Sequence, residues 1–218
     1  LVGTEAVSTY GFGFNASRSN FTFDDEGYRY LNAGSDAGLA NAGSGAIRTR
    51  LFSQFAKVNY DYNNFLLGDF TVRRDGSSRL AEANRYGVFP AGSFGVRLTE
   101  LKALNNISWL QDLKVRAGWG AVGNQGVSPY QTQGLLGRTA YAWDNTAAFG
   151  YRPNTIGNPD LRWETSTTFN TGVDFSFFKG RILGSLEYYV TNTTDLLAPQ
   201  PLPNSTGFGG FITNIGET

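Results

Sequence analysis

Glu164 and Asp174 are two carboxylates that could form a catalytic acid–base pair within one segment, and they are ten residues apart. In an extended strand that rises about 3.3 Å per residue, their separation would be about 33 Å. A glycosidase needs its two carboxyl groups roughly 5–10 Å apart. We therefore expect both residues to belong to a polar pathway or contact surface.

The glycines of Gly118–Gly123 formally match the GxGxxG pattern of dinucleotide sites. That fingerprint must follow a strand and open a helix. Here the glycines lie inside a segment that alternates between apolar and small residues, and Pro129 follows soon after. We interpret them as small residues on one face of a sheet rather than as a nucleotide site.

The amino-acid composition argues against several other kinds of catalytic and binding site. The chain has neither histidine nor cysteine, so it lacks the commonest general base, thiolate metal ligands and disulfides. Carboxylate or Ser–Lys catalysis would still be available. Lys+Arg and Asp+Glu are both 18, so there is no excess of basic residues that would favour binding of nucleic acid. The sequence therefore predicts a protein that is not an enzyme and binds no cofactor, metal or nucleic acid.

Four aromatic residues lie in a long proline-containing segment, 123–162, that we expect to be a loop: Tyr130, Tyr141, Trp143 and Tyr151. Exposed aromatic rings are common anchors at binding surfaces. These rings could stack on sugar rings of a substrate. They could equally pack the loop itself or contact a second protein, and the sequence leaves the three readings open.

The segment 163–195 is predicted to be a β-hairpin that positions the carboxylates. Its first arm places aromatic, β-branched and uncharged residues at odd positions and Glu164, Asn170 and Asp174 at even positions. After a short turn at 178–181 the pattern resumes, with Glu187 on the polar face. Each arm exceeds the roughly 9–11 residues that cross a membrane. A membrane-spanning hairpin and a hairpin of a soluble β-sandwich both fit this pattern.

The same alternation recurs weakly at 1–14 and clearly at 48–60, 66–73, 86–98 and 113–121, and an eighth strand begins within 212–216. In 113–121, Lys114 and Arg116 occupy the polar face. Pro90 predicts a bulge or break, because proline donates no ladder hydrogen bond. A short helical turn is expected within 99–111. The connections alternate in length: 15–47, 123–162 and 196–211 are long, 61–64 and 178–181 are short, and 76–85 and 99–111 are intermediate.

Long loops on one side and short turns on the other are typical of outer-membrane barrels. The composition agrees, since charged residues make up 17% and aromatic residues 15% of the chain. We therefore predict an all-β, antiparallel transmembrane β-barrel segment of about seven to eight strands. The apolar face would contact lipid and the polar face would line the lumen.

Several strings, in order along the chain, resemble one family. They are Val58–Tyr62, Val72–Arg79, Asn84–Ala91, Leu113–Ala117 with Gly123–Gly126, Asn158–Glu164, and Asp195–Leu197 with Pro201–Pro203. Together they are similar to the C-terminal half of the β-barrel of SusC/RagA-type TonB-dependent outer-membrane transporters. Several strings recurring in sequence are more specific than any one of them.

The resemblance implies that residues 1–218 are part of a single barrel domain within a larger, plugged 22-strand-type barrel. The plug and the TonB box would lie outside this chain. Expected partners are a SusD-type surface lipoprotein that acts as a lid, TonB through the absent parts, outer-membrane lipid, and a glycan or oligopeptide cargo.

The implied function is TonB-dependent import of a large nutrient across the outer membrane of a Gram-negative cell. The aromatic residues of 123–162 would then contact cargo or lid. Six residues are expected to face the lumen: Lys114, Arg116, Glu164, Asn170, Asp174 and Glu187. Two alternatives remain at this point. One is a small self-contained outer-membrane barrel with an adhesive or structural role, and the other is a soluble all-β glycan-binding module.

Overall fold

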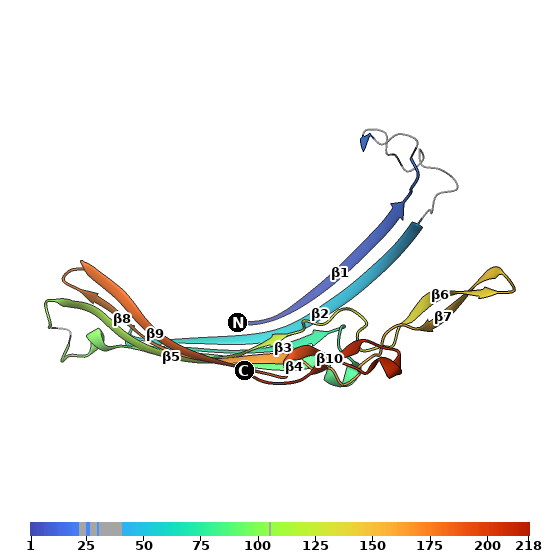
Figure 1. Ribbon diagram of the computed structural model, residues 1–218. Coiled ribbons are helices and arrows are strands. Elements are labelled where there is room, and N and C mark those ends of the chain that lie inside the picture. Colours follow the sequence, from blue (N-terminus) through green and yellow to red (C-terminus); the bar gives the residue numbers. More distant parts are fainter. Residues whose placement is uncertain (22–24, 27–29, 31–40, 105) are drawn as a thin grey trace. The chain divides into compact units, whose positions relative to one another are not determined.

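The computed structural model describes residues 1–21, 25, 26, 30, 41–104 and 106–218. The chain forms two compact units, one of Leu1–Val7 with Arg50–Thr218 and one of Ser8–Thr49. The larger unit holds most of an antiparallel sheet (Figure 1). In spatial order its strands are β1 (Val2–Ser17), β2 (Asn41–Tyr62), β3 (Leu66–Ser77), β4 (Tyr86–Arg97), β5 (Leu110–Asn124), β8 (Glu164–Phe177) and β9 (Ile182–Thr194).

The predicted all-β antiparallel architecture is confirmed, and the sheet has seven strands among the described residues. Short 3-10 turns are formed by η3 (Glu82–Asn84), η4 (Leu98–Glu100) and η5 (Asn204–Thr206). The helical turn expected within 99–111 thus lies slightly earlier, at η4. Within the part of the chain described, no helix is long and apolar enough to cross a membrane.

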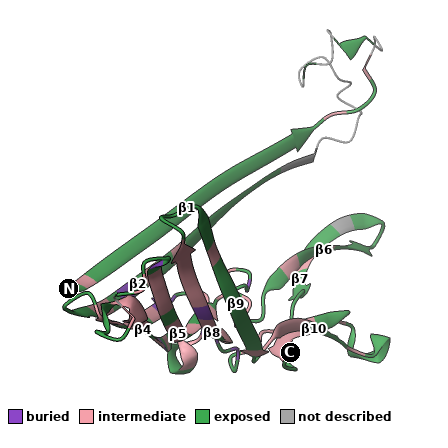
Figure 2. Ribbon diagram, turned by 90° about the vertical axis from the view of Figure 1, so that its left-hand side faces the viewer, coloured by how far each residue is buried: buried purple, intermediate pink, exposed green. Residues whose placement is uncertain are grey.

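The strands are joined by long hydrogen-bonded ladders. The β2–β3 ladder extends from Tyr62 opposite Leu66 to Leu51 opposite Ser77. At the start of β1, Leu1 and Lys57 exchange backbone hydrogen bonds of 2.9 and 2.8 Å. Figure 2 shows β1 and β9, the two ends of the described sheet, as largely exposed, whereas β5 and β8 are mostly of intermediate exposure.

Side chains alternate between two faces, and the register carries each face from β2 through β3, β4, β5 and β8 to β9. We call one the polar face; one of its rows is Asn59, Asp69, Ser93, Gly118, Asn170 and Tyr189. We call the other the aromatic face. Its members include Val58, Phe70, Phe94, Trp119, Phe169 and Leu186. The period-2 prediction of which residues share a face is therefore confirmed.

Pro90 breaks only one of its two ladders. On the β3 side the register passes through Val72 opposite Pro90 without a shift. On the β5 side the β4 ladder ends at Ala91, one residue away. The predicted bulge is thus wrong for the β3 side, because proline lacks a donor in one direction only.

The long connections contain more structure than expected. In 123–162, β6 (Leu136–Trp143) and β7 (Thr146–Pro153) form a two-stranded ribbon. In 196–211, β10 (Leu197–Pro201) begins a second ribbon with β11 (Gly210–Asn214). In 15–47 the strands reach Ser17 and resume at Asn41, so that loop was predicted too long at both ends; much of what remains of it lies outside the described residues.

Most of the described residues of the unit Ser8–Thr49 lie in the adjoining parts of β1 and β2. Within it, the guanidinium of Arg48 lies 5.7 Å from the ring centre of Tyr10. Gly43 faces Asn15 closely, since a Cβ on Gly43 would lie 2.8 Å from Asn15 Oδ1. This part of the chain is thus a paired strand extension with its own cross-strand contacts.

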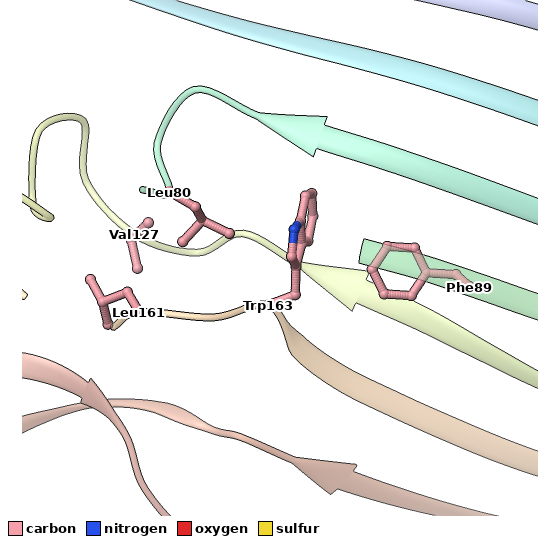
Figure 3. Packing of buried hydrophobic residues seen from close by; sticks show 5 residues of the cluster. All are labelled: Leu80, Phe89, Val127, Leu161 and Trp163. Atoms are coloured by element: carbon pink, nitrogen blue, oxygen red, sulfur yellow. The ribbon is translucent and has the colours of Figure 1, made fainter. Parts of the chain in front are cut away.

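A small hydrophobic cluster packs the ends of the strands against the connections that follow them. Its buried members are Leu80, Phe89, Val127, Leu161 and Trp163 (Figure 3). The rings of Phe89 and Trp163 meet edge to face, with their centres 5.4 Å apart. Trp163 also donates its indole N–H to the backbone oxygen of Arg85 at 3.1 Å. The cluster therefore fastens the β3–β4 connection to the segments that flank the β6–β7 ribbon.

Leu161 is fully buried in this cluster. We predict that Leu161→Ala in the full-length protein lowers the free energy of unfolding by about 2–5 kcal/mol, because it leaves a cavity in a packed core. Denaturant unfolding in detergent measures the change. The control is Leu136→Ala, whose side chain is 69% exposed on β6 and which should shift stability by less than about 0.5 kcal/mol. Equal effects of the two substitutions would contradict the assignment of Leu161 to a core.

Candidate functional site

Arg116 of β5 is the centre of a polar network on the polar face. Its Nε donates to Asp174 Oδ2 at 3.2 Å, and its Nη1 donates to Asn170 Oδ1 at 3.4 Å. Its Nη2 donates to Glu187 Oε1. One arginine therefore joins β5 to β8 and β9 through two carboxylates and an amide. The guanidinium suits this role because it carries five donors in a fixed planar fork.

A glycine makes room for that guanidinium. Gly172 lies directly opposite Arg116 across the β5–β8 ladder. A Cβ at this position would lie 3.2 Å from Arg116 Cζ and 3.1 Å from the backbone oxygen of Leu186. The glycine thus lets the side chain of Arg116 lie across β8 and reach Glu187 on β9.

The structure brings together four of the six residues predicted on this face, and the other two lie apart from the network. Lys114 is opposite Arg97 and Asp174. Both of those neighbours are engaged elsewhere, Arg97 with Asp112 and Asp174 with Arg116. No ion pair joins Lys114 to any described residue, so it contributes an uncompensated positive charge beside the network.

Glu164 has a different, local role. Its Oε1 accepts a hydrogen bond from Asn124 Nδ2, and its Oε2 accepts one from the backbone N–H of Leu197, both at 3.0 Å. These bonds tie the start of β8 to the end of β5 and to the start of β10. Glu164 and Asp174 do not contact each other, as their spacing predicted. The contacts of Glu164 give no support to its predicted role as a pathway residue.

The network borders a shallow hollow of about 560 Å³ on the polar face. Its lining includes Asn59, Asp69, Ser93, Lys114, Arg116, Gly118 and Asn170. The hollow therefore offers donors, acceptors and charges of both signs around small residues that permit close approach of a backbone. Among the described residues no cluster of acidic side chains is arranged to hold a metal ion. This arrangement suits reversible polar contacts.

A second arginine network on the same face was not predicted. Arg73 donates from Nε to Asp75 Oδ1 at 2.7 Å, and from Nη2 to Ser53 Oγ at 2.9 Å and Glu5 Oε2 at 3.0 Å. Ser53 is fully buried, and the ring of Phe55 lies 5.9 Å from the guanidinium. Alternation alone places Arg73 and Asp75 on the polar face. The other two partners, Glu5 and Ser53, come from β1 and β2, and a single sequence does not reveal how these strands align with β3.

The four aromatic residues predicted as a contact cluster do not gather in one place. Tyr141 and Trp143 share one face of the β6–β7 ribbon, with ring centres 6.4 Å apart. Tyr151 lies opposite Arg138 on the other face. Tyr130 lies outside the ribbon, in a turn where its φ is 65°. Only Tyr141 and Trp143 can therefore act as a joint platform.

The opposite face of the ribbon carries a contact that the sequence did not indicate. The guanidinium of Arg138 lies 3.9 Å from the ring centre of Phe149, within the range of a cation–π contact. Phe149 is 62% exposed and Tyr151 is 75% exposed. The ribbon thus presents aromatic surface on both faces, which is unusual for a segment that packs against the rest of a protein.

Comparison with known proteins gives consistent relatives. The family described as TonB dependent receptor-like, beta-barrel, matches residues 2–218. TonB-dependent receptor SusC of Bacteroides thetaiotaomicron is 36% identical over 223 residues, covering 100% of this chain and 21% of SusC. TonB-dependent receptor P3 of Formosa agariphila is 34% identical over 202 residues, covering 93% of this chain and 20% of the relative.

A solved structure is also closely similar. The structure of the RagAB peptide transporter superimposes with a TM-score of 0.87 at 29% sequence identity, covering 99% of this chain and 24% of the matched chain. The chain therefore spans between a fifth and a quarter of the length of these relatives. The hollow and both arginine networks lie within the matched region.

We predict that Arg116→Gln in the full-length protein lowers the denaturant concentration at the midpoint of unfolding, because Asp174 and Glu187 then face each other without a cation. Adding Glu187→Gln should restore part of the loss, since the two residues act as one network. The control Lys114→Gln removes a cation of the same face that has no described ion partner, and it should leave the midpoint in place. Strict additivity of the two network substitutions would show that Arg116 and Glu187 are not coupled.

Proposed function

The chain belongs to the TonB dependent receptor-like β-barrel family and is a barrel portion of a SusC/RagA-type TonB-dependent transporter, and from this premise we propose that the whole protein actively imports a large nutrient across the outer membrane. This chain would supply barrel wall and outer loops, and residues 1–218 would be part of a single barrel domain. The observation that carries the proposal is the sorting of side chains between the two faces of the sheet.

We propose that the aromatic face contacts lipid and the polar face lines the lumen. Strands of 12 to 16 residues, and of 22 residues in β2, exceed the roughly 9–11 residues that cross a membrane. Phe70, Phe94 and Phe169 are between 45% and 55% exposed on the aromatic face. Exposed aromatic side chains in such number favour a lipid-facing surface over a soluble module.

On the lumen side we propose that the Arg116 network and the hollow beside it contact the plug or line the import pathway. The residues that we propose for this role are Lys114, Arg116, Asn170, Asp174 and Glu187. Because charges of both signs surround small residues there, polar protein segments and hydrated cargo are both chemically suited to it. Glu164 is the residue whose contacts favour a structural role instead.

We propose that the β6–β7 ribbon contacts cargo or a SusD-type lipoprotein lid. The support is the exposed pair Tyr141 and Trp143, 67% and 72% exposed, on one face of a ribbon with few other contacts. Aromatic residues that bury large area at low entropic cost are typical of binding surfaces. Tyr151 would contribute to the opposite face, and Tyr130 would act separately at the base. Coupling to TonB would occur through other parts of the protein, and the cargo would be a glycan or an oligopeptide.

Import itself is tested in cells that lack the full-length gene and are complemented with variants. We predict that the wild type restores uptake of labelled oligosaccharides or oligopeptides and that an uncoupler of the inner membrane abolishes it. Tyr141→Ala with Trp143→Ala should reduce uptake several-fold at equal surface expression, because the joint platform is lost. The control Thr139→Ala lies on the same ribbon face and should leave uptake unchanged. Uptake that survives the uncoupler would contradict active import.

The orientation of the faces has its own test. We predict that Val173→Arg in the full-length protein costs roughly 2–4 kcal/mol, because it places a charge on the lipid face near mid-membrane. The control Ser185→Arg introduces the same charge on the polar face, next to Asp174 across the ladder, and should cost less. The readout is the fraction of folded, heat-modifiable protein in the outer membrane. A larger defect from Ser185→Arg would reverse the assignment of the faces.

A further inference from the structure

The aromatic face of the larger unit carries almost no charge. In the described strands β2, β3, β4, β5, β8 and β9 from Arg50 onward, every Asp, Glu and Lys lies on the polar face by register, and the charged residues of the aromatic face are Arg50 and Arg74. Glu5 of β1 contacts Arg73 on the polar face. Both arginines lie toward the long-loop end of β2 and β3. Two cations and no anion on an otherwise uncharged face require an explanation.

Arg74 is held in a defined position. Its guanidinium lies 4.1 Å from the ring centre of Tyr86, and its Nη1 donates to Gln54 Oε1 at 3.3 Å. Tyr86 lies opposite Gly76, and a Cβ at Gly76 would overlap its ring. The glycine therefore allows the ring to lie flat across β3, where it forms the surface on which the guanidinium stacks.

No described acidic side chain can pair with Arg74 on this face. Its direct cross-strand neighbours are Gln54 and Val88, and the next positions along β3 are Val72 and Gly76. Arg74 is an exposed residue, and so is Tyr86, which is 48% exposed. The ring contact and the hydrogen bond from Nη1 leave other N–H donors of the guanidinium without an acceptor in the described chain. An anion from outside the chain could accept hydrogen bonds from these donors.

The height of Arg74 on the strand limits what that anion can be. Arg74 lies eight residues above Leu66, the short-turn end of β3, which is about 26 Å along a strand at about 3.3 Å per residue. With the usual tilt of about 40°, this corresponds to a height of about 20 Å, close to the upper margin of an apolar band about 25 Å tall. An arginine at such a margin extends its apolar stem along the band and its charged head to the headgroups.

We propose that Arg74, supported by Tyr86 and Gln54, binds the phosphate of a lipid headgroup in the outer leaflet. The inference rests on the proposed function, because it requires the aromatic face to contact lipid. A guanidinium recognises phosphate through paired N–H donors, which an ammonium does not offer. The apolar neighbours Val72 and Val88 suit the acyl chains of the same lipid rather than a free anion. In the other unit, Arg48 above Tyr10 repeats the combination of cation and ring.

The test uses the full-length transporter purified in detergent and mixed micelles that contain phosphatidic acid as the probe. We expect Arg74→Gln to weaken binding of the fluorescently labelled probe at least tenfold, equivalent to about 1.4 kcal/mol. Arg74→Lys should lose less, because it keeps the charge but not the fork. Tyr86→Leu should also weaken binding, through loss of the stacking surface. The control Lys114→Gln removes a cation from the polar face and should bind as the wild type does.

Three results would overturn the proposal. The first is binding by Arg74→Gln at wild-type strength. The second is equal binding of diacylglycerol, which carries the same acyl chains but no phosphate. The third is displacement of the probe by inorganic phosphate at an equal phosphate concentration, which would indicate a site for soluble anions. If Val173→Arg disrupts insertion as expected while Arg74→Gln binds normally, the lipid site is wrong and the orientation stands. If Ser185→Arg is the more harmful of the two, the orientation itself is wrong.

Discussion

The structure depends on one constraint: a sheet that lies in hydrocarbon must satisfy its backbone hydrogen bonds between strands, because no water is present to do so. Long backbone ladders between neighbouring strands satisfy this constraint, and they fix the alternation of side chains along every strand. A one-residue slip in register would exchange the two faces completely. The register therefore decides the chemistry of each residue more strongly than its neighbours in sequence do. Even Pro90, which removes a donor, is placed where it ends a ladder on one side and leaves the other unbroken.

The conventional core is correspondingly small and lies where the sheet meets its connections. Leu161 and Trp163 are buried there, whereas the mid-strand residues Phe70 and Phe169 remain about half exposed. In a soluble protein this distribution would be unstable, because the largest apolar side chains would face water. It becomes favourable when lipid or other strands cover the aromatic face. The small core then has a local task, which is to hold the connections, including the segments that carry the β6–β7 ribbon, in fixed positions on the strands.

Alternation allowed the strands of the seven-stranded sheet and the polar residues of β5, β8 and β9 to be predicted from sequence, because a period of two is a local signal. The ribbon of β6 and β7 was missed, because short exposed strands rich in Gly, Ala and Tyr resemble loop composition. The contacts of Arg73 were missed for a different reason. Glu5, Ser53 and Arg73 come from three strands, and their meeting depends on a register that no single segment specifies. The four loop aromatics were grouped by sequence proximity, yet the ribbon's own alternation separates Tyr151 from Tyr141 and Trp143.

Arg73 and Arg74 show how far one residue step changes function. They are consecutive, of the same type and on the same strand, yet they point to opposite faces. Arg73 finds Asp75, Ser53 and Glu5 on the polar face, so its charge is compensated within the chain. Arg74 finds only a tyrosine ring and an amide on the aromatic face, so its charge is left for the surroundings. If an arginine served merely to keep this strand soluble, either face would do. The preparation of a stacking surface for Arg74, through Gly76 beneath Tyr86, favours a partner that comes from the membrane itself.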